Sequence, residues 1–376
     1  MWRRELTIST TRKLLGVTIA AGVIVALAGC GAAPSSNPTS AGPTAVAGFK
    51  PCIVSDDGGW NDKSFNESAL NGIKAAAKEL GVKEIDVQSD SANDYAPNLE
   101  NLVAQGCTFI ISVGFKLSAD TVKSALANPK IDYAIIDDSA DGNNDGKPDA
   151  PNIKPLLFDT VQAAYLGGYA AAAWSHQEGA DKVGTFGGLQ IPPVTIFMDG
   201  FIDGVKKYND DEKSSVATFG WDVDKQTGAF TGGFAANDTA KQTAQGILDQ
   251  GVDVILPVGG PIYQSAAAAI KDSGKKTVML GVDSDLAVAD PSVADVTLVS
   301  IMKRIDNAVH DATLAAAKGD FDTTPYVGTL ENGGVGLSSF HDFESKLPKG
   351  LTDKLDELKK QIISGDLKVT SPSSPK

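Results

Sequence analysis

Short apolar runs alternate with longer amphipathic segments from Pro51 onward, and this alternation constrains the fold more than any other feature. The runs predict strands at 52–55, 84–88, 109–113, 133–136, 182–186, 215–218, 254–258, 278–282 and 297–301. The segments between them predict helices at 64–80, 95–105, 117–127, 161–176, 195–208, 239–250, 262–273 and 303–318. Alternation of strands and helices predicts an α/β fold with parallel sheets that helices cover on both faces.

The series of strand–helix units is interrupted once. Four units end near Asp138, an irregular stretch continues to Leu157, and a second series begins at Lys182. The break predicts two doubly wound domains. Because ligands of such sheets bind beyond the carboxyl ends of the strands, two domains that face each other would hold a ligand in the cleft between them.

The amino-terminal segment has the pattern of a secretory signal. Arg3, Arg4, Arg12 and Lys13 precede an apolar run that extends from residue 14 to residue 28. The run is shorter than the ~20 residues that cross a hydrocarbon core, so a cleaved signal peptide over 1–29 is favoured over a transmembrane helix.

The signal ends in Leu27-Ala28-Gly29-Cys30, which resembles a bacterial lipobox. We therefore expect acyl chains, palmitate among them, to be attached to Cys30 and to anchor the protein at the extracytoplasmic face of the cell membrane. Residues 30–48 are rich in Pro, Ser, Gly and Ala and contain almost nothing that can be buried, which predicts a flexible tether.

The charge of the chain excludes one class of partner. The formal net charge is −14, and removal of the basic signal segment makes it more negative. Such an acidic protein has no electrostatic attraction for nucleic acid, so nucleic acid is not expected as a partner.

Cys52 and Cys107 each stand at the start of an apolar run. In an oxidising compartment two such cysteines can be linked. If the runs form neighbouring parallel strands, about 4.8 Å apart, their first residues lie within disulfide reach. A Cys52–Cys107 disulfide is the favoured prediction, and two buried free thiols are the alternative.

The segment after the first predicted strand carries the most specific motif. It reads Ser-Asp-Asp-Gly-Gly-Trp-Asn-Asp-Lys-Ser-Phe-Asn over residues 55–66. Two glycines allow a tight turn, and Asp62 or Ser64 can cap the following helix. The segment resembles the D-x-G-G-x-x-D-K/R-S-F-N signature of the basic membrane protein lipoproteins, the purine-nucleoside receptor type of ABC-transporter binding protein.

Further blocks extend this resemblance over residues 51–340. They are Tyr-Leu-Gly-Gly-Tyr-Ala-Ala at 165–171, Lys-Val-Gly at 182–184 leading to Gly-Gly at 187–188, Asp-Gly-Phe-Ile-Asp-Gly-Val at 199–205, Gly-Val-Asp-Ser-Asp at 281–285 and Ser-Ile-Met-Lys-Arg at 300–304. The resemblance implies a two-domain, type I periplasmic-binding-protein plan, a nucleoside ligand and an ABC permease as the membrane partner.

This plan predicts that the chain crosses between the two domains three times, near 157–160, 295–302 and 330–340, and these crossings set the domain boundaries. The amino-terminal lobe is predicted to comprise 49–158 plus about 300–332, and the carboxyl-terminal lobe 159–299 plus about 333–365. Residues 366–376 are predicted to be a tail.

The resemblance also implies roles for individual residues. Two aromatic rings would stack on the base, Asp56 and Asn66 would contact its polar edges or the sugar, and Asp283, oriented by Lys303, would accept hydrogen bonds from the ribose hydroxyls. Trp221 is an alternative to Phe234 as the second ring. Asp57 and Asn61 depart from the family pattern, which leaves the base preference open. The implied ligand-binding residues are Asp56, Phe65, Asn66, Asp137, Phe234, Gly260, Asp283 and Lys303.

An acidic stretch at residues 141–149 resembles a calcium-binding loop. Asp141, Asn143, Asp145 and Asp149 occupy positions 1, 3, 5 and 9, with glycine at position 6, but Asn152 stands where the bidentate glutamate is expected. A solvated acidic loop is the favoured interpretation, and calcium binding stays open.

No motif in the sequence predicts catalysis. The three histidines are far apart and none belongs to a pair with metal-ligand spacing. No dinucleotide or Walker fingerprint is present, and no cofactor is expected. The favoured function is solute capture for uptake, with a sugar-binding protein of the same fold and a nucleoside-processing enzyme as alternatives.

Overall fold

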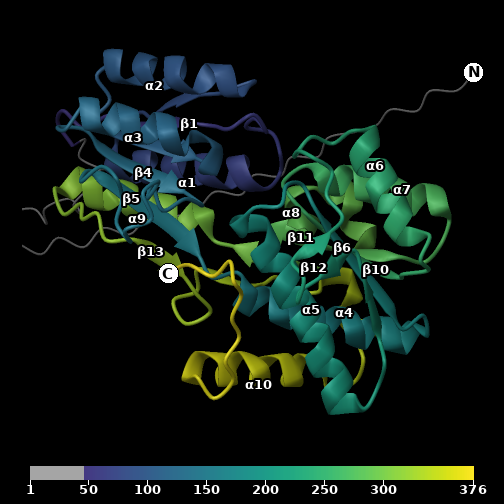
Figure 1. Ribbon diagram of the computed structural model, residues 1–376. Helices are drawn as coiled ribbons and strands as arrows, with labels where there is room; N and C mark the ends of the chain where they lie inside the picture. Colours follow the sequence, from purple (N-terminus) through teal and green to yellow (C-terminus); the bar gives the residue numbers. More distant parts are fainter. Residues whose placement is uncertain (1–45) are drawn as a thin grey trace, which may run out of the picture. The chain divides into compact units, whose positions relative to one another are not determined.

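The computed structural model describes residues 46–376. The predicted signal segment, Cys30 and the tether up to residue 45 lie outside the described residues. None of the helices within 46–376 combines the length and the apolar composition that a membrane crossing requires. Two six-stranded sheets with helices on both faces make up the described chain (Figure 1), which confirms the predicted α/β fold.

The first sheet is parallel throughout, in the order β13-β5-β4-β3-β1-β2. Its strands are β1 (Pro51–Val54), β2 (Ile85–Val87), β3 (Phe109–Val113), β4 (Asp132–Ile136), β5 (Ile153–Phe158) and β13 (Tyr326–Gly328). Its helices are α1 (Phe65–Leu80), α2 (Tyr95–Ala104), α3 (Ser118–Ala127) and α9 (Ile305–Lys318). Ile53 packs against α1 and α9, whereas its neighbours Cys52 and Val54 pack against α2 and α3, because successive side chains of a strand point to opposite faces. We call this sheet and its helices the first lobe.

The second sheet has the order β14-β12-β11-β10-β6-β7, with only β14 antiparallel to its neighbour. Its strands are β6 (Lys182–Gly187), β7 (Ala217–Phe219), β10 (Val254–Val258), β11 (Val278–Asp283), β12 (Thr297–Lys303) and β14 (Val335–Leu337). Its helices are α4 (Val161–Glu178), α5 (Pro192–Glu212), α6 (Asp238–Leu248), α7 (Ile262–Ser273), α8 (Leu286–Ala289) and α10 (Leu351–Ser364). Ile255 packs against α6 and α7, and Leu256 faces the opposite layer with α4 and α5. We call this group the second lobe.

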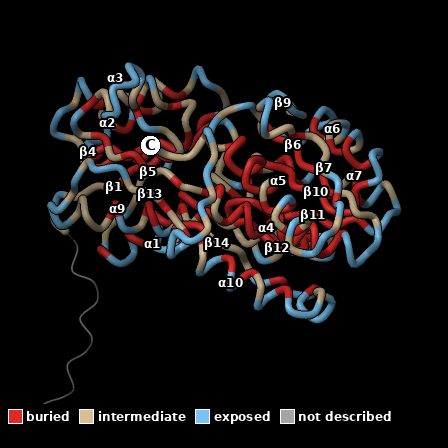
Figure 2. Tube along the Cα trace, turned by 60° about the horizontal axis from the view of Figure 1, so that its bottom comes forward, coloured by how far each residue is buried: buried red, intermediate tan, exposed pale blue. Residues whose placement is uncertain are grey.

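Smaller elements complete the two lobes. A two-stranded hairpin, β8 (Trp221–Asp222) with β9 (Thr227–Gly228), precedes α6. Four short 3-10 helices occupy Ala92–Asp94, Phe115–Leu117, Pro291–Val296 and His341–Lys346. Figure 2 shows that the buried residues gather in the strands and in α4 and α5.

Glycines hold α4 and α5 close together. A Cβ atom at Gly168 of α4 would collide with the backbone carbonyl of Phe201, and one at Gly204 of α5 would collide with that of Tyr165. The glycine blocks at 165–171 and 199–205 therefore serve helix packing, which lets the backbones of α4 and α5 approach each other closely.

The chain passes between the lobes three times. The first passage leads from β5 to α4, the second from β12 to α9, which packs on α1, and the third from β13 to β14. The second passage follows Lys303 instead of falling within the predicted 295–302, because Thr297–Lys303 forms one continuous strand beside β11.

Several strands were missed by the sequence analysis. Strand β5 lies within the stretch predicted to be irregular, because Lys154 and Pro155 interrupt its apolar run. It nevertheless pairs with β4 on one side and β13 on the other. Strands β13 and β14 have three residues each and depend on partners that are distant in sequence.

A disulfide links Cys52 and Cys107, whose Cα atoms are 6.0 Å apart. Cys52 belongs to β1, and Cys107 lies two residues before β3, which is the parallel neighbour of β1. The bridge therefore joins the amino ends of two central strands of the first sheet.

The carboxyl-terminal segment Ser371–Lys376 leads from α10 to α5 and to the first passage between the lobes. The hydroxyl of Ser371 donates to Asp199 Oδ2 of α5 at 2.5 Å, and the hydroxyl of Ser374 donates to Asp159 Oδ1 at 2.8 Å. Because Asp159 lies between β5 and α4, the segment is attached to a hinge position.

Candidate functional site

A cavity lies where the carboxyl ends of the two sheets meet. It is lined from the first lobe by residues that follow β1, β3 and β4, and from the second lobe by residues at the ends of β10, β11 and β12. The space not filled by protein atoms is about 560 Å³, part of it open to solvent. The eight residues predicted to bind a ligand all line this cavity: Asp56, Phe65, Asn66, Asp137, Phe234, Gly260, Asp283 and Lys303.

The loop after β1 is held by Asp62, which caps α1. Its Oδ2 accepts a hydrogen bond from the Asn66 N–H at 2.8 Å, and its Oδ1 accepts from the N–H groups of Ser64 and Glu67 at 3.0 Å. Asp62 is buried and lines the cavity. The sequence predicted a helix cap at Asp62 but not its place in the cavity wall.

Asp56 and Asn66 form one hydrogen-bonded unit. Asn66 Nδ2 donates to Asp56 Oδ1 at 2.8 Å, the Gly58 N–H donates to the same oxygen at 2.8 Å, and Asn66 Oδ1 accepts from the Asp56 N–H at 3.3 Å. Burial raises the pKa of Asp56 to about 6, against the lowering effect of these hydrogen bonds. Asp56 is therefore an anionic acceptor above that pH and a protonated carboxyl below it.

Lys303 is buried between two carboxylates. Its Nζ lies 2.5 Å from Asp137 Oδ2 and 3.6 Å from Asp283 Oδ1, and its side chain is 3% exposed. Burial opposes the charge of Lys303, but the two carboxylates outweigh burial and raise its pKa. Burial also raises the pKa of Asp137, although the charge of Lys303 acts in the opposite direction. Lys303 thus connects the first lobe, through Asp137, with Asp283 of the second.

Both carboxylates are on strained backbone. Asp137 has φ 62° and Asp283 has φ 65°, in the left-handed region that side chains other than glycine, Asn and Asp rarely adopt. Each residue directly follows or ends a strand, β4 or β11. Backbone strain of this kind concentrates at binding and catalytic sites, where it holds side chains in fixed directions.

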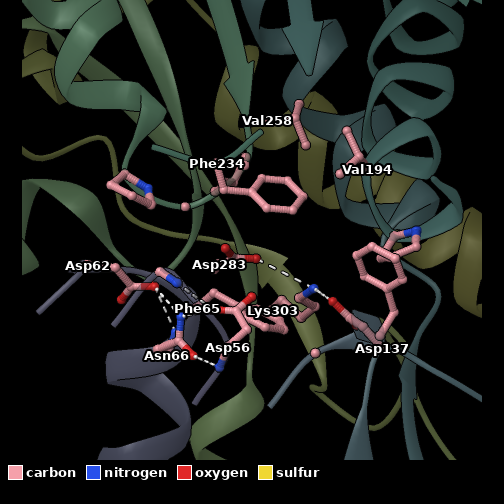
Figure 3. A pocket seen from close by; sticks show the side chains of 18 of the residues that line it. Asp56, Asp62, Phe65, Asn66, Asp137, Val194, Phe234, Val258, Asp283 and Lys303 are labelled. Carbon is pink, nitrogen blue, oxygen red and sulfur yellow. Dashed lines mark hydrogen bonds and ion pairs between the residues drawn. The ribbon is translucent and has the colours of Figure 1, made fainter. Parts of the chain in front are cut away.

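Two phenylalanine rings lie on opposite sides of the cavity (Figure 3). Phe65 comes from the start of α1, and its ring centroid lies 4.9 Å from Lys303 Nζ. Phe234 comes from the loop between β9 and α6 and packs on the backbone of Gly188 and Gly259, where any Cβ atom would collide with the ring. The cavity therefore has one aromatic wall from each lobe.

The alternative ring, Trp221, lies elsewhere. It is buried, and its Nε1–H donates to Asp199 Oδ1 at 2.8 Å. Its ring packs edge-on against Phe230, with the centroids 5.8 Å apart. Trp221 does not line the cavity, so of the two rings considered only Phe234 faces it.

The cavity also has an apolar wall that sequence reasoning missed. Ile191, Pro193, Val194 and Phe197 line it from the start of α5, and Phe115 lines it from the first lobe. Prolines at the first positions of α5 indicate a helix start after β6, and the carboxyl end of β6 faces the same edge of the sheet. These prolines, placed after a predicted strand, were the feature of the sequence that could have predicted this wall.

A second hollow adjoins the cavity and shares Phe115 and Asp137 with it. Residues Pro372–Lys376 of the carboxyl-terminal segment form part of its wall, together with residues of the acidic loop such as Asp141 and Lys147.

The acidic loop hydrogen-bonds mainly to itself. Asp141 accepts from the N–H groups of Asp145 and Gly146 at 3.0 and 2.8 Å, and Asp149 accepts from Gly142 and Asn143. Within residues 46–376, no three His, Cys, Asp or Glu side chains are grouped so that they could hold a metal ion.

The histidines lie outside the cavity wall. His176, His310 and His341 each pair with a carboxylate elsewhere in the described chain, at distances of 2.6 to 3.1 Å. The cavity therefore presents carboxylates, one lysine, one amide and aromatic rings.

Comparison with known proteins finds relatives over most of the chain. Residues 49–372 match the family described as "ABC transporter substrate-binding protein PnrA-like". The chain is 32% identical to a CD4+ T-cell-stimulating antigen of Listeria monocytogenes, over 96% of this chain and 98% of that protein. It is 30% identical to the ABC transporter nucleoside-binding protein BmpA of Lactococcus lactis, over 94% and 97%. An ABC transporter solute-binding protein from Aeropyrum pernix K1 has the same fold, with a TM-score of 0.72, 27% identity and coverage of 86% and 94%.

Proposed function

Because the chain belongs to the PnrA-like family of ABC transporter substrate-binding proteins, we propose that it captures a nucleoside, preferably a purine nucleoside, in the cavity between its lobes and delivers it to an ABC permease. The observation that carries this proposal is the pair of facing rings, Phe65 and Phe234, beside the Asp137–Lys303–Asp283 triad. We expect a flat base to stack between the two rings and the hydroxyl groups of its sugar to donate to the carboxylates.

The energetics support this ligand class. Stacking on an aromatic side chain contributes about 1–3 kcal/mol per base. Carboxylates are acceptors, and the hydroxyls of a ribose are donors, so Asp283 is matched to a sugar with vicinal hydroxyls. Asp56 and Asn66, on the side of Phe65, offer acceptor and amide groups to the polar edge of the base.

The charge of the cavity favours nucleosides over nucleotides. Among the described residues that line it, Asp56, Asp62, Asp137 and Asp283 face a single basic residue, Lys303, which two carboxylates already hold. Two like unit charges about 6 Å apart repel each other by about 3 kcal/mol at an effective dielectric constant of about 20. A phosphate in this cavity would lack a free cation to offset that repulsion.

Calorimetric titration tests the proposal. The protein is first unfolded and refolded to remove any bound solute. Adenosine, guanosine, inosine, cytidine and uridine are compared with their 5′-monophosphates and with monosaccharides at pH 7.5. We expect at least one nucleoside to bind near the micromolar range, about −8 kcal/mol, and its monophosphate to bind at least ~100-fold more weakly. Equal affinities for the nucleoside and its 5′-monophosphate would contradict the charge argument.

A sugar is the second candidate ligand, because the carboxylates beside Lys303 suit the hydroxyl groups of any sugar. Heat from a monosaccharide, with none from any nucleoside, would select this alternative. Release of free base during incubation with a nucleoside would instead indicate an enzyme.

We further propose that acyl chains on Cys30 hold the protein at the extracytoplasmic face of the cell membrane, as the sequence Leu-Ala-Gly-Cys at 27–30 indicates. Cys30→Ser should release the protein into the soluble fraction, because the thiol that receives the lipid is gone. Fractionation of cells that express the two forms checks this. Membrane retention of Cys30→Ser would refute the anchor.

A further inference from the structure

Ser64 forms a hydrogen-bonded connection between the two lobes. It lies before α1 in the first lobe, and its hydroxyl donates to Asp283 Oδ2 at the end of β11 in the second lobe, at 2.8 Å. The same hydroxyl lies 3.3 Å from the Val282 carbonyl, and the Ser284 hydroxyl donates to the Ser64 carbonyl at 3.4 Å. Ser64 is 1% exposed, so this contact is shielded from water.

The hydroxyl of Ser64 is not needed by its own helix. Ser64 occupies the N-cap position of α1 but makes no side-chain capping bond. Asp62 accepts the hydrogen bonds from the first turn instead, from the N–H groups of Asn66 and Glu67. The ordinary role of a serine before a helix, which is to cap it, therefore does not account for Ser64.

Asp283 is held from both lobes. Its Oδ1 faces Lys303 at 3.6 Å, and its Oδ2 accepts from Ser64 at 2.8 Å. With φ fixed at 65° and both oxygens engaged, the carboxylate has one direction in this arrangement. If the lobes separate about their three passages, as hinged binding proteins do, the bond from Ser64 is lost while Lys303, at the end of the neighbouring strand β12, remains close.

We propose that Ser64 is a positioning residue: its hydroxyl orients Asp283 toward the hydroxyl groups of the ligand only when the lobes are closed, and so couples closure to recognition of the sugar. This inference rests on the proposed nucleoside-binding function. Ser64 itself does not line the cavity and acts through Asp283. A ligand that needs Asp283 then favours the closed form beyond its direct contacts, since it binds that form better than the open one.

The test compares wild type, Ser64→Ala and Ser284→Ala with two ligands. The ligands are the nucleoside that wild type binds best and its 2′,3′-dideoxy analogue, which lacks the hydroxyls assigned to Asp283. Ser284→Ala is the matched control, because its hydroxyl lies in the same connection but contacts a backbone carbonyl and not Asp283. Calorimetry gives Kd, stopped-flow gives the dissociation rate, and thermal melting without ligand reports the stability of each variant.

Ser64→Ala should weaken binding of the nucleoside about 10- to 100-fold, the range for loss of a hydrogen bond to a charged group. The loss should come mainly from faster dissociation. For the dideoxy analogue, Ser64→Ala should lower the affinity by less than about 3-fold. Ser284→Ala should lower the affinity for either ligand by less than about 3-fold. The melting temperatures of both variants without ligand should equal that of wild type.

Two results would overturn the inference alone: nucleoside binding by Ser64→Ala equal to that of wild type, or an equal loss for both ligands, which would mean that Ser64 does not act through Asp283. Failure of wild type itself to bind any nucleoside would overturn the proposed function, and this inference with it.

Discussion

Replacement of Lys303 with methionine should lower the free energy of unfolding by about 3–5 kcal/mol at pH 7, because it leaves the buried carboxylates of Asp137 and Asp283 without their cation. Methionine preserves most of the length and the apolar stem of lysine, so lost packing contributes little. Chemical denaturation in the absence of ligand measures the difference. The same substitution should also remove measurable nucleoside binding, since Asp283 loses one of the two groups that orient it.

The loss of unfolding free energy caused by Lys303→Met should depend on pH. In the variant, the lowering effect of Lys303 on the Asp137 pKa is gone, so burial raises that pKa further. The folded variant then binds more protons than the unfolded chain above the ordinary carboxyl range, and its stability falls as pH rises toward the raised pKa. The difference from wild type should therefore be smaller near pH 4.5 than near pH 8.

Lys154→Met provides the matched control. Lys154 also pairs with an aspartate, Asp322, at 3.2 Å, but Asp322 is 65% exposed. An exposed pair of this kind contributes about 0–1 kcal/mol, with little pH dependence between 4.5 and 8. Equal losses of unfolding free energy for Lys154→Met and Lys303→Met would show that the effect of Lys303→Met does not come from the burial of the triad.

The double variant Cys52→Ala/Cys107→Ala should lose about 4 kcal/mol of stability. The disulfide closes a loop of 55 residues, and the chain-entropy model assigns about 4 kcal/mol to a loop of that length. Differential scanning calorimetry of the oxidised wild type and the double variant measures the change in melting temperature.

Nucleoside affinity should be the same in the double variant as in wild type at a temperature where both are folded. The disulfide lies at the amino ends of β1 and β3, whereas the cavity lies at the carboxyl ends.

A melting temperature of the double variant equal to that of wild type would contradict the predicted loss of stability. It would mean that the unfolded chain gains no conformational freedom when the bridge is removed.

Much of the fold could be predicted because its strands are apolar runs with clear helices between them. The loop after β1 resembles the family signature over residues 55–66, and this resemblance implied roles for Asp56, Phe65 and Asn66 together. The roles of Asp283 and Lys303 also came from the resemblance: Asp283 directly follows a predicted strand, whereas Lys303 was predicted to begin a helix and instead ends β12. All these residues line one cavity because the carboxyl ends of parallel strands meet at one edge of each sheet.

The sequence did not predict the features that depend on contacts between distant segments. Strand β5 contains Lys154 and Pro155, and only its pairing with β4 and β13 makes it a strand. The apolar wall from Ile191 to Phe197 belongs to the first turns of α5, where the pattern alone does not say which side faces the other lobe. The bond from Ser64 to Asp283 spans 219 positions, and no local pattern encodes it.

The course of the carboxyl-terminal segment affects how the protein should be handled. Pro372–Lys376 lie in the wall of the hollow beside the cavity, and Ser374 is bonded to a hinge position. A purification tag or a fluorescent fusion added after Lys376 would therefore start in the wall of the hollow beside the cavity and close to the first passage between the lobes. Fusion partners belong on the amino-terminal side, before Phe49, because β1 begins at Pro51 and the cavity lies at the carboxyl ends of the strands.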